Sequence, residues 1–552
     1  MEYSKLVSVY QELEKTRSRL EMTSIVAGFL EEVPAEDLSV IMLLLSGRIF
    51  PMWSEKELGV GYKIMIKAVS AVTGVPEGKV EDAVRETGDL GIAAEKLLAR
   101  KTQTTLVSRE LTVEKVYENL DKLATLSGKG SQDKKISYVT ELLSYSKPAE
   151  GRYIVRTVLE ELRLGVGEGI LRDAIAESFG VDPKLVERAY SLSCDLGEVA
   201  KVARSEGNAG LERIDIKPGR PIESMLAQKV DSVAAAIAEF KTCAFEIKYD
   251  GARIQIHKTG QHVELYTRRL ENVTHQFPEL VRYAKENIKA ETAVVEGEMV
   301  AIKSASDRSP RPFQDLSRRI KRKYDISEMV KQIPVEMNLF DILYYEDKNT
   351  ISEKFADRRK LLKKIIHETD AFKLAEQLVT SDVAEAEKFY SHALELGHEG
   401  VMAKNMDSPY QPGSRVGYMY KIKPVMETLD LVVIGATWGE GRRAHWLGSY
   451  LLAARDPDTG ELLTIGRMAT GFSDEQLKEM TETLKADVSE EIGKEVKLKP
   501  KVVVEVAYEE IQKSPTYTSG YALRFPRLVR IRPDKGPEDA DTLQRIEQLL
   551  AG

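Results

Sequence analysis

Apolar residues in roughly the first 210 positions recur at spacings of three and four, which is the period of an α-helix. Val139, Leu142 and Leu143 show this spacing, and prolines or glycines such as Pro148 stand at the breaks between the periodic stretches. Because proline and glycine commonly begin or end helices, each break is read as a helix boundary. The pattern predicts an all-helical domain over residues 1–215.

The period of the pattern then changes. Residues 214–221 carry two prolines and a glycine, which is typical of a linker. From Phe245 onward, apolar and polar residues alternate, as they do along a half-buried β-strand. Further strands are expected at 293–302, 335–343, 401–404 and 418–422, with helices at 356–367 and 383–396. The interleaving of both element types predicts an α+β domain over residues 216–424.

Strand patterns dominate the last part of the chain. Short alternating runs are expected as strands at 429–437, 448–454, 462–467 and 502–508, with helices at 474–484 and 539–550. About 125 residues of short strands with one internal helix suit a small barrel such as an OB-fold. The predicted fold class is therefore multidomain: an all-α domain, an α+β domain, and a β-barrel OB-fold domain at 425–552.

Composition narrows the classes of protein that fit this pattern. The 552 residues are 42% hydrophobic, and 80 Lys and Arg stand against 88 Asp and Glu, for a net charge of -8. Collagen-like, disordered and strongly basic proteins are excluded, so any nucleic-acid surface must be a local patch. Two cysteines, Cys194 and Cys243, cannot form a disulfide framework or a four-thiolate zinc site.

The expected location follows from the same features. Few cysteines fit a reducing compartment. The first 22 residues form a charged amphipathic pattern without the apolar core of a signal peptide, and no apolar run approaches the ~20 residues of a membrane span. We expect a soluble intracellular protein, cytoplasmic and associated with the nucleoid, that has no membrane partner.

One predicted strand presents a lysine beside a glutamate. Between Phe245 and Arg253, residues two apart share a face, so Phe245 and Ile247 are expected in the core while Glu246 and Lys248 point together to the other side. A lysine at the edge of a sheet is usually solvated. By itself, therefore, this pair favours an ordinary surface strand.

The same geometry is repeated twice in the domain. Glu296 and Glu298 stand two apart, as do Lys421 and Lys423. Gly297, between the two glutamates, leaves room for another backbone on the opposite face. Converging lysines and carboxylates suit a polyanion and a divalent metal, so a nucleoside triphosphate fits the pattern. A lysine in such a site becomes a nucleophile if desolvation and nearby positive charge lower its pKa.

The lysine lies within a longer recognisable motif. The run Lys248–Arg253 (KYDGAR) resembles the KxDGxR motif of the covalent nucleotidyltransferases, the superfamily of ATP-dependent DNA ligases, RNA ligases and mRNA capping enzymes. Further motifs of the superfamily follow in its order at 266–269 (YTRR), 296–298 (EGE), 340–343 (FDIL), 399–404 (EGVMAK), 420–423 (YKIK) and 524–535 (RFPRLVRIRPDK). Several motifs in order are far more specific than one.

The resemblance implies roles for particular residues. Lys248 would be the catalytic nucleophile that forms a lysyl-AMP adduct with ATP. Glu399 would bind Mg²⁺, and Glu298 would hold the ribose or assist the metal. The remaining nucleotide contacts implied by the motifs are Glu246, Arg253, Arg268, Phe340 (stacked on the purine), Arg415, Lys421 and Lys423.

The helical region extends the resemblance to almost the whole chain. Residues 128–135 (GKGSQDKK) and the segment 153–165 are similar to the DNA-binding domain of archaeal and eukaryotic replicative ATP-dependent DNA ligases. Backbone N–H groups near Gly128 could grip DNA phosphates without reading sequence. The resemblance implies a monomeric enzyme that seals nicks in duplex DNA during replication, repair and recombination. The alternatives are an RNA ligase or capping-type enzyme, and a non-catalytic DNA- and clamp-binding scaffold.

Two further patches are candidate DNA or protein contacts. The run 318–323 holds five cations in six residues, which fits either a solvated helix face or a DNA backbone contact. Residues 524–535 hold five cations that, by resemblance, would orient the leaving pyrophosphate. Gln103–Leu106 (QTTL) is a candidate sliding-clamp contact, although the aromatic pair that usually completes such a motif is absent.

Overall fold

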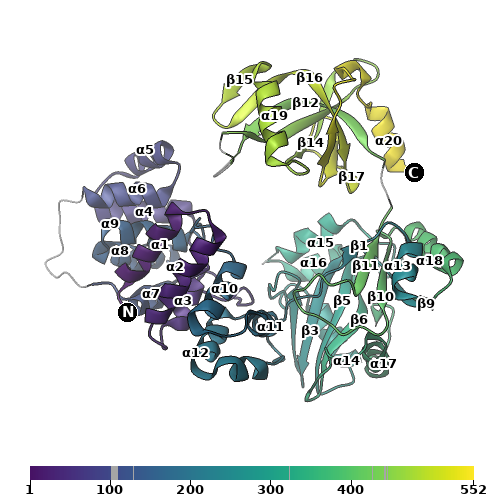
Figure 1. The fold of residues 1–552 in the computed structure, drawn as a ribbon, viewed down its shortest axis with the longest axis horizontal. Coiled ribbons are helices and arrows are strands. Elements are labelled where there is room, and N and C mark those ends of the chain that lie inside the picture. Colours follow the sequence, from purple (N-terminus) through teal and green to yellow (C-terminus); the bar gives the residue numbers. More distant parts are fainter. Residues whose placement is uncertain are drawn as a thin grey trace. The chain divides into compact units, whose positions relative to one another are not determined.

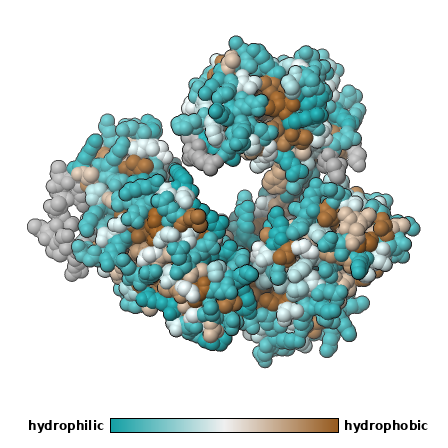
Figure 2. All heavy atoms as spheres, viewed as in Figure 1, coloured by the Kyte–Doolittle hydropathy of each residue, from teal (hydrophilic) through white to brown (hydrophobic). Residues whose placement is uncertain are grey.

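A computed structural model describes residues 1–100, 110–128, 130–322, 324–424, 427–439, 443 and 445–551. These residues form two compact units, one over Met1–Lys423 and one from Pro424 onward. Within the described ranges, no helix is both long enough and apolar enough to cross a membrane. Hydrophilic side chains predominate on the face shown in Figure 2, with apolar ones in small patches.

The first unit begins with the predicted helices (Figure 1). Several start at a side chain that accepts an otherwise unpaired backbone N–H of the first turn: Asp89 accepts from the Ile92 N–H at 2.9 Å, and Asp182 accepts from the Lys184 N–H at 2.8 Å. The described helices of this region are α1 Tyr3–Lys15, α2 Arg19–Glu32, α3 Leu38–Leu45, α4 Tyr62–Thr73, α5 Glu77–Thr87, α6 Leu90–Ala99, α7 Val113–Thr125, α8 Ser131–Tyr145, α9 Pro148–Val158, α10 Glu168–Phe179, α11 Pro183–Ser193 and α12 Leu196–Arg213. The helical prediction for this part of the chain is confirmed.

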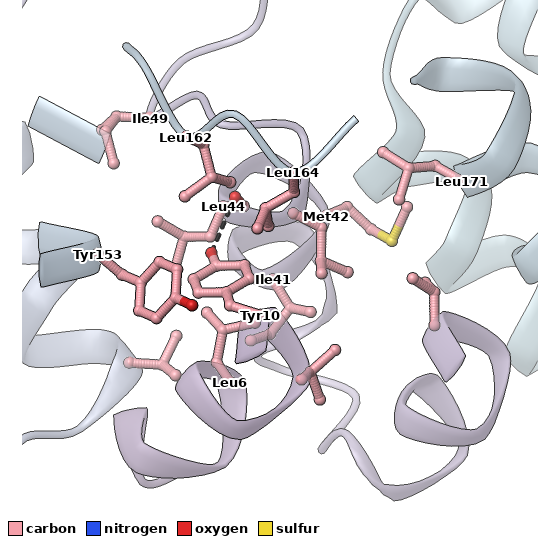
Figure 3. Close-up of a cluster of buried hydrophobic side chains, with 14 of the residues drawn as sticks. Leu6, Tyr10, Ile41, Met42, Leu44, Ile49, Tyr153, Leu162, Leu164 and Leu171 are labelled. Carbon is pink, nitrogen blue, oxygen red and sulfur yellow. Dashed lines mark hydrogen bonds between the residues drawn. The ribbon is translucent and has the colours of Figure 1, made fainter. Parts of the chain in front are cut away.

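The helices pack around a continuous apolar core, part of which Figure 3 shows. The rings of Tyr10 and Tyr153 lie 4.9 Å apart, between α1 and α9. The Tyr10 hydroxyl donates a hydrogen bond of 2.9 Å to the Leu44 carbonyl, so this buried polar atom is satisfied. The three-and-four spacing of the sequence therefore corresponds to the buried faces of these helices.

The rest of the first unit contains two sheets, which confirms the α+β prediction. One sheet has the order β1-β11-β10-β2-β9, and the other has the order β4-β3-β5-β6-β7 with β8 beside β6. The strands are β1 Gln228–Lys229, β2 Cys243–Ile247, β3 Ala252–Thr259, β4 His262–Thr267, β5 Thr292–Ala301, β6 Val335–Tyr345, β7 Lys348–Asn349, β8 Phe372–Leu374, β9 Gln377–Thr380, β10 Val401–Asn405 and β11 Met419–Ile422. The helices are α13 Val233–Phe240, α14 Pro278–Asn287, α15 Phe313–Ile320, α16 Ile326–Gln332, α17 Phe355–Ile365 and α18 Val383–Glu395.

Two local expectations for these sheets are confirmed. Phe245 and Ile247 of β2 are buried in an apolar cluster. At Gly297 of β5, a Cβ would lie 2.6 Å from the carbonyl oxygen of Asn338 on β6. The missing side chain therefore lets two backbones approach closely, and the register of β5 and β6 shifts between Glu296 and Gly297.

The second unit is built on a sheet of order β14-β13-β12-β16-β15, with β19 beside β16 and a separate β17-β18 pair. Its elements are β12 Leu429–Trp438, β13 Leu447–Arg455, β14 Leu462–Met468, α19 Asp474–Lys485, β15 Val488–Ile492, β16 Glu495–Ala507, β17 Glu510–Lys513, β18 Tyr521–Arg524, β19 Arg527–Ile531, the short 3-10 helix η2 Pro537–Asp539 and α20 Leu543–Ala551. Register shifts bend β12 and β13, but the described strands do not close into the expected barrel. The pattern also missed β15, β17, β18 and β19, which are short and rich in charge.

Candidate functional site

Lys248 lies directly after β2, where the neighbouring chain brings it an acidic partner. The Lys248 N–H donates to the Gly400 carbonyl at 2.8 Å, and the Glu399 N–H donates to the Lys248 carbonyl at 3.0 Å. Gly400 has a φ of 132°, and a Cβ there would lie 2.2 Å from the Ile422 carbonyl oxygen. This position therefore requires glycine, and the resulting backbone path sets Glu399 beside Lys248.

Two lysines converge on the Glu399 carboxylate. Lys248 Nζ forms an ion pair with Glu399 Oε2, and Lys423 Nζ lies 2.7 Å from the same oxygen. The Glu399 side chain is 20% exposed. Burial favours the neutral acid, but the two ammonium groups outweigh it and hold the pKa of Glu399 well below its usual range. A lysine attacks through the lone pair of its free amine, so Lys248 must turn from Glu399 toward the reacting phosphorus before it can act as a nucleophile.

Glu298 of β5 is a second carboxylate near the lysine. Burial, assisted by the negative charges of Glu399 and Asp250, raises the pKa of Glu298 to about 7, although the positive charges of Lys248 and Arg253 oppose the shift. Carboxylate oxygens are the ligands that Mg²⁺ prefers. In the part of the chain that the structure describes, no three His, Cys, Asp or Glu side chains form a ready metal cluster. A metal held here would need further ligands from phosphate and water.

The other glutamate of this motif, Glu296, is wholly buried in a polar network. Arg253 Nη2 donates to Glu296 Oε2 at 2.5 Å and to the Tyr410 hydroxyl at 3.1 Å, and Arg253 Nη1 donates to the Met225 carbonyl at 2.9 Å. The Tyr410 hydroxyl donates to Glu296 Oε2 at 2.8 Å. Tyr410 belongs to no motif, and because its contacts join distant parts of the chain, no pattern in the sequence could have identified it.

The Phe340 ring lies among cations. The guanidinium of Arg253 is 5.2 Å from the ring centre, and Lys404 Nζ is 4.4 Å from it. Lys404 in turn donates to Glu246 Oε2 at 2.6 Å, and Gln377 Nε2 donates to Glu246 Oε1 at 2.9 Å. The predicted nucleotide residues Glu246, Arg253 and Phe340 are thus brought together. Lys404 ends the motif at 399–404, but the resemblance implies no role for it. Gln377 of β9 belongs to no motif, and the sequence did not identify it.

The remaining cations predicted for the site differ in exposure. Arg268 and Arg415 are exposed, whereas Lys421, on β11, is half-buried. Partial burial lowers the pKa of Arg268, and the positive charges of Arg253 and Arg415 lower it further. Three arginines close enough to repel one another form a cluster that the negative charge of a phosphate chain would relieve.

The cations of residues 524–535 are largely paired with carboxylates of their own unit. Arg530 Nε donates to Glu505 at 2.6 Å, Lys535 Nζ to Asp430 at 2.7 Å, and Arg524 Nη1 to Glu510 at 3.1 Å. Arg532 pairs with Asp430 and Asp534. The cluster expected to meet pyrophosphate is therefore already ordered by neighbouring acids.

The expected DNA-contacting run at 318–323 requires correction. Arg319 is fully buried: its guanidinium pairs with Glu279 at 2.5 Å and lies 4.4 Å from the centre of the Phe277 ring. Arg318 is 76% exposed at its side chain and remains available to a phosphate. A helix sends adjacent residues to different faces, so the run divides between the core and the surface. Lys323 lies outside the described residues.

Two segments of the helical region were expected to contact DNA or a sliding clamp. Lys135, in the glycine-rich segment expected at DNA, points inward, because its Nζ donates to the Leu58 carbonyl at 2.7 Å. Gly128 and Gly130 both adopt a φ of 82°, which forms the turn before α8. The candidate clamp contact at Gln103–Leu106 falls outside the described residues.

Comparisons with known families cover most of the chain. A family model described as "ATP dependent DNA ligase domain" matches residues 224–423, one described as "DNA ligase N terminus" matches residues 2–176, and one described as "ATP dependent DNA ligase C terminal region" matches residues 443–535. The three matches divide the chain in the order that the helical, α+β and strand-rich regions follow.

Individual proteins match along their whole length. The DNA ligase of Thermococcus onnurineus is 53% identical over 550 residues, which is 100% of this chain and 98% of that protein. The DNA ligase of Archaeoglobus fulgidus is 48% identical over 550 residues, with the same coverage of 100% and 98%. The solved structure "Pmar-Lig_PreS3" superposes with a TM-score of 0.58 at 19% identity, over 96% of this chain and 99% of that chain, which shows a shared fold.

Proposed function

The chain belongs to the family of ATP-dependent DNA ligases, and from that premise we propose that Lys248 is the residue that carries AMP from ATP to a nick in DNA. The observation that supports this role is the position of Lys248 directly after β2, where it shares the Glu399 carboxylate with Lys423. Full-length similarity to DNA ligases disfavours the alternatives of an RNA ligase or capping-type enzyme and of a scaffold without activity.

The proposed chemistry has three balanced steps. Lys248 Nζ loses a proton and attacks the α-phosphorus of ATP; an N–P bond forms while the bond to the bridging oxygen breaks, and pyrophosphate leaves. The 5′-phosphate at the nick then attacks the same phosphorus and takes the AMP, which frees the lysine. The 3′-hydroxyl finally attacks the 5′-phosphate, loses its proton, and AMP leaves with the bonding electrons.

The surrounding residues are proposed to align these groups and to neutralise charge, which lowers the barrier to phosphoryl transfer. Glu298 would hold the ribose, Phe340 would stack on the purine, and Glu246 would supply a further nucleotide contact. The cations proposed to contact the nucleotide and its phosphates are Arg253, Arg268, Arg415, Lys421 and Lys423. Of these, Arg253 is also held by Glu296 and Tyr410, so it would act from a fixed position.

Glu399 and Glu298 are proposed to hold Mg²⁺. Two carboxylates near one lysine are a suitable donor set, and ATP phosphates and water would complete the coordination. When bound, the ion would neutralise phosphate oxygens. Because Glu399 carries the ion pair with Lys248, any cation that engages this carboxylate competes with that pair and favours release of the amine.

The C-terminal unit is proposed to be an OB-fold that closes over ATP and then over DNA. Its five-strand path, the β19 partner of β16 and the helix α19 support this assignment. We also propose that the enzyme acts as a monomer on nicked duplex DNA in replication, repair and recombination, inside the cell. Contact with a sliding clamp through Gln103–Leu106 stays a prediction.

Intact mass measurement after incubation with ATP and Mg²⁺ tests the assignment of Lys248. We expect one added AMP, located on Lys248 by peptide mapping. The Lys248→Ala protein should accept no AMP but should bind nicked DNA as before, whereas the control Lys285→Ala, an exposed lysine on α14, should be labelled normally. A Lys248→Ala protein that still forms the adduct would refute the proposal.

A further inference from the structure

A cluster of charged side chains lies on one face of the C-terminal sheet. Asp430 on β12 stands directly opposite Glu505 on β16, and Glu505 stands opposite Arg530 on β19. Directly opposed residues of neighbouring strands share a face and contact one another. The side chains of Asp430 and Glu505 are only 13% and 16% exposed. Two nearly buried acids side by side therefore require cations.

Asp430 holds two of those cations. Arg532 Nη1 donates to both carboxylate oxygens of Asp430, at 3.1 and 2.9 Å, and Lys535 Nζ donates to Asp430 Oδ2 at 2.7 Å. The opposite side of the Arg532 guanidinium meets Asp534, with Nε at 3.0 Å and Nη2 at 2.7 Å. All three nitrogens of Arg532 thus donate to carboxylates. Lys535 has three N–H donors, of which Asp430 accepts one.

The backbone of Asp430 is itself fixed. Its N–H donates to Asp541 Oδ2 at 2.7 Å, and its carbonyl accepts from the Asp541 N–H at 2.8 Å. The Arg532 N–H donates to the Val503 carbonyl at 2.8 Å. Because the backbone of Asp430 is fixed by these hydrogen bonds, its carboxylate can hold the flexible side chains of Arg532 and Lys535 in one position.

We infer that Asp430 is a positioning residue for the transfer of AMP from ATP to the enzyme, because it orders Arg532 and Lys535 for the phosphates of ATP. The inference rests on the proposed function, in which the C-terminal unit closes over ATP, and on the role at the leaving pyrophosphate that the family resemblance implies for residues 524–535. Long cationic side chains lose conformational freedom when they bind an anion, and a partner that orders them beforehand reduces this cost. Cations held in place also stabilise developing charge better than mobile ones.

Glu505 provides a contrast on the same sheet. Its close partner Arg530 is 65% exposed, and Arg532 lies 4.0 Å from the Glu505 carboxylate. Asp430 instead holds Arg532 at 2.9 Å and Lys535 at 2.7 Å, and these two side chains are only 15% and 29% exposed. An exposed ion pair is weak and screened by salt. We therefore expect Asp430, and not its cross-strand neighbour, to affect the reaction with ATP.

Two assays on the full-length protein separate the steps. The first measures single-turnover formation of lysyl-AMP from ATP, and the second measures sealing of a nick that already carries AMP, which needs no ATP. Asp430→Asn should slow the first at least tenfold, about the effect of losing one charge-assisted hydrogen bond, and change the second less than twofold. Glu505→Gln should change both less than twofold. Asp430→Glu, which restores the charge, should recover much of the first rate.

Other results of these assays would contradict the role of Asp430. An unchanged or faster reaction with ATP in Asp430→Asn would overturn it, and so would an equal loss in both assays, because a purely structural defect affects all steps. If Asp430→Asn does not fold, as shown by circular dichroism, Asp430→Glu decides by the same comparison. Lys535→Ala tests the premise: if it leaves the ATP step intact, the proposed role of residues 524–535 fails, whereas loss in Lys535→Ala without loss in Asp430→Asn refutes only the role of Asp430.

Discussion

Replacing Tyr410 by phenylalanine removes one hydroxyl from the network that holds Arg253. In the structure this hydroxyl donates to Glu296 Oε2 at 2.8 Å and accepts from the Met225 N–H at 2.9 Å and from Arg253 Nη2 at 3.1 Å. Tyr410 is 3% exposed and Met225 is 5% exposed. Phenylalanine has nearly the same volume, so the loss is one of hydrogen bonds and not of packing.

The magnitude follows from the groups left behind. A buried N–H that loses its acceptor costs about 1–3 kcal/mol, and the Met225 N–H becomes such a group. Arg253 keeps Glu296 and the Met225 carbonyl, and Glu296 keeps Arg253 and Gln255, so their losses are smaller. Together we expect a loss of about 2–4 kcal/mol in the free energy of opening around Met225. Because about 1.4 kcal/mol changes an equilibrium constant tenfold, a loss of about 2 kcal/mol makes the open state, and therefore exchange of that amide, roughly 30-fold more frequent.

Hydrogen–deuterium exchange of the peptide around Met225 measures this opening. A matched control is Tyr344→Phe, on β6 in the same unit, where the side chain is half-buried. Since Tyr410 also fixes Arg253, the Michaelis constant for ATP should rise in Tyr410→Phe. Exchange at Met225 no faster in Tyr410→Phe than in Tyr344→Phe would show that the network does not hold this segment.

Two further predictions concern the charged groups. The pKa of Glu298 is raised to about 7 from an ordinary value of 4.5, so its contribution to stability is present below pH 4.5 and is lost as the pH rises through 7. Mg²⁺ affinity, followed by calorimetry, should therefore increase with pH up to about 7 with release of protons, and Glu298→Gln should abolish this proton release; pH-independent binding would contradict the assignment. Arg319→Ala should lower the free energy of unfolding by about 3–5 kcal/mol, because Glu279 loses its buried partner. Arg318→Ala should leave stability unchanged and reduce the slope of log K for DNA against log salt by about one; equal effects of the two changes would refute the division between core and surface.

Several features of this enzyme are determined by short-range pattern. The change of apolar period near residue 215 separates helices from sheets, because the two backbone geometries place side chains at different intervals. Gly297 indicates a close backbone approach by its residue type alone, since only a residue without a side chain admits a neighbouring backbone at that distance. The order of the motifs identified the family and the candidate nucleophile Lys248.

Other features depend on contacts between residues far apart in the sequence. Arg318 and Arg319 are adjacent and chemically identical, yet one is exposed and the other is fully buried with Glu279, 40 positions away. Tyr410 and Asp430 bear no local signature either. A sequence determines which side chains share a face of one element, because that depends on backbone periodicity; only tertiary packing decides which faces meet, and therefore which charges are neutralised and which remain for ATP and DNA.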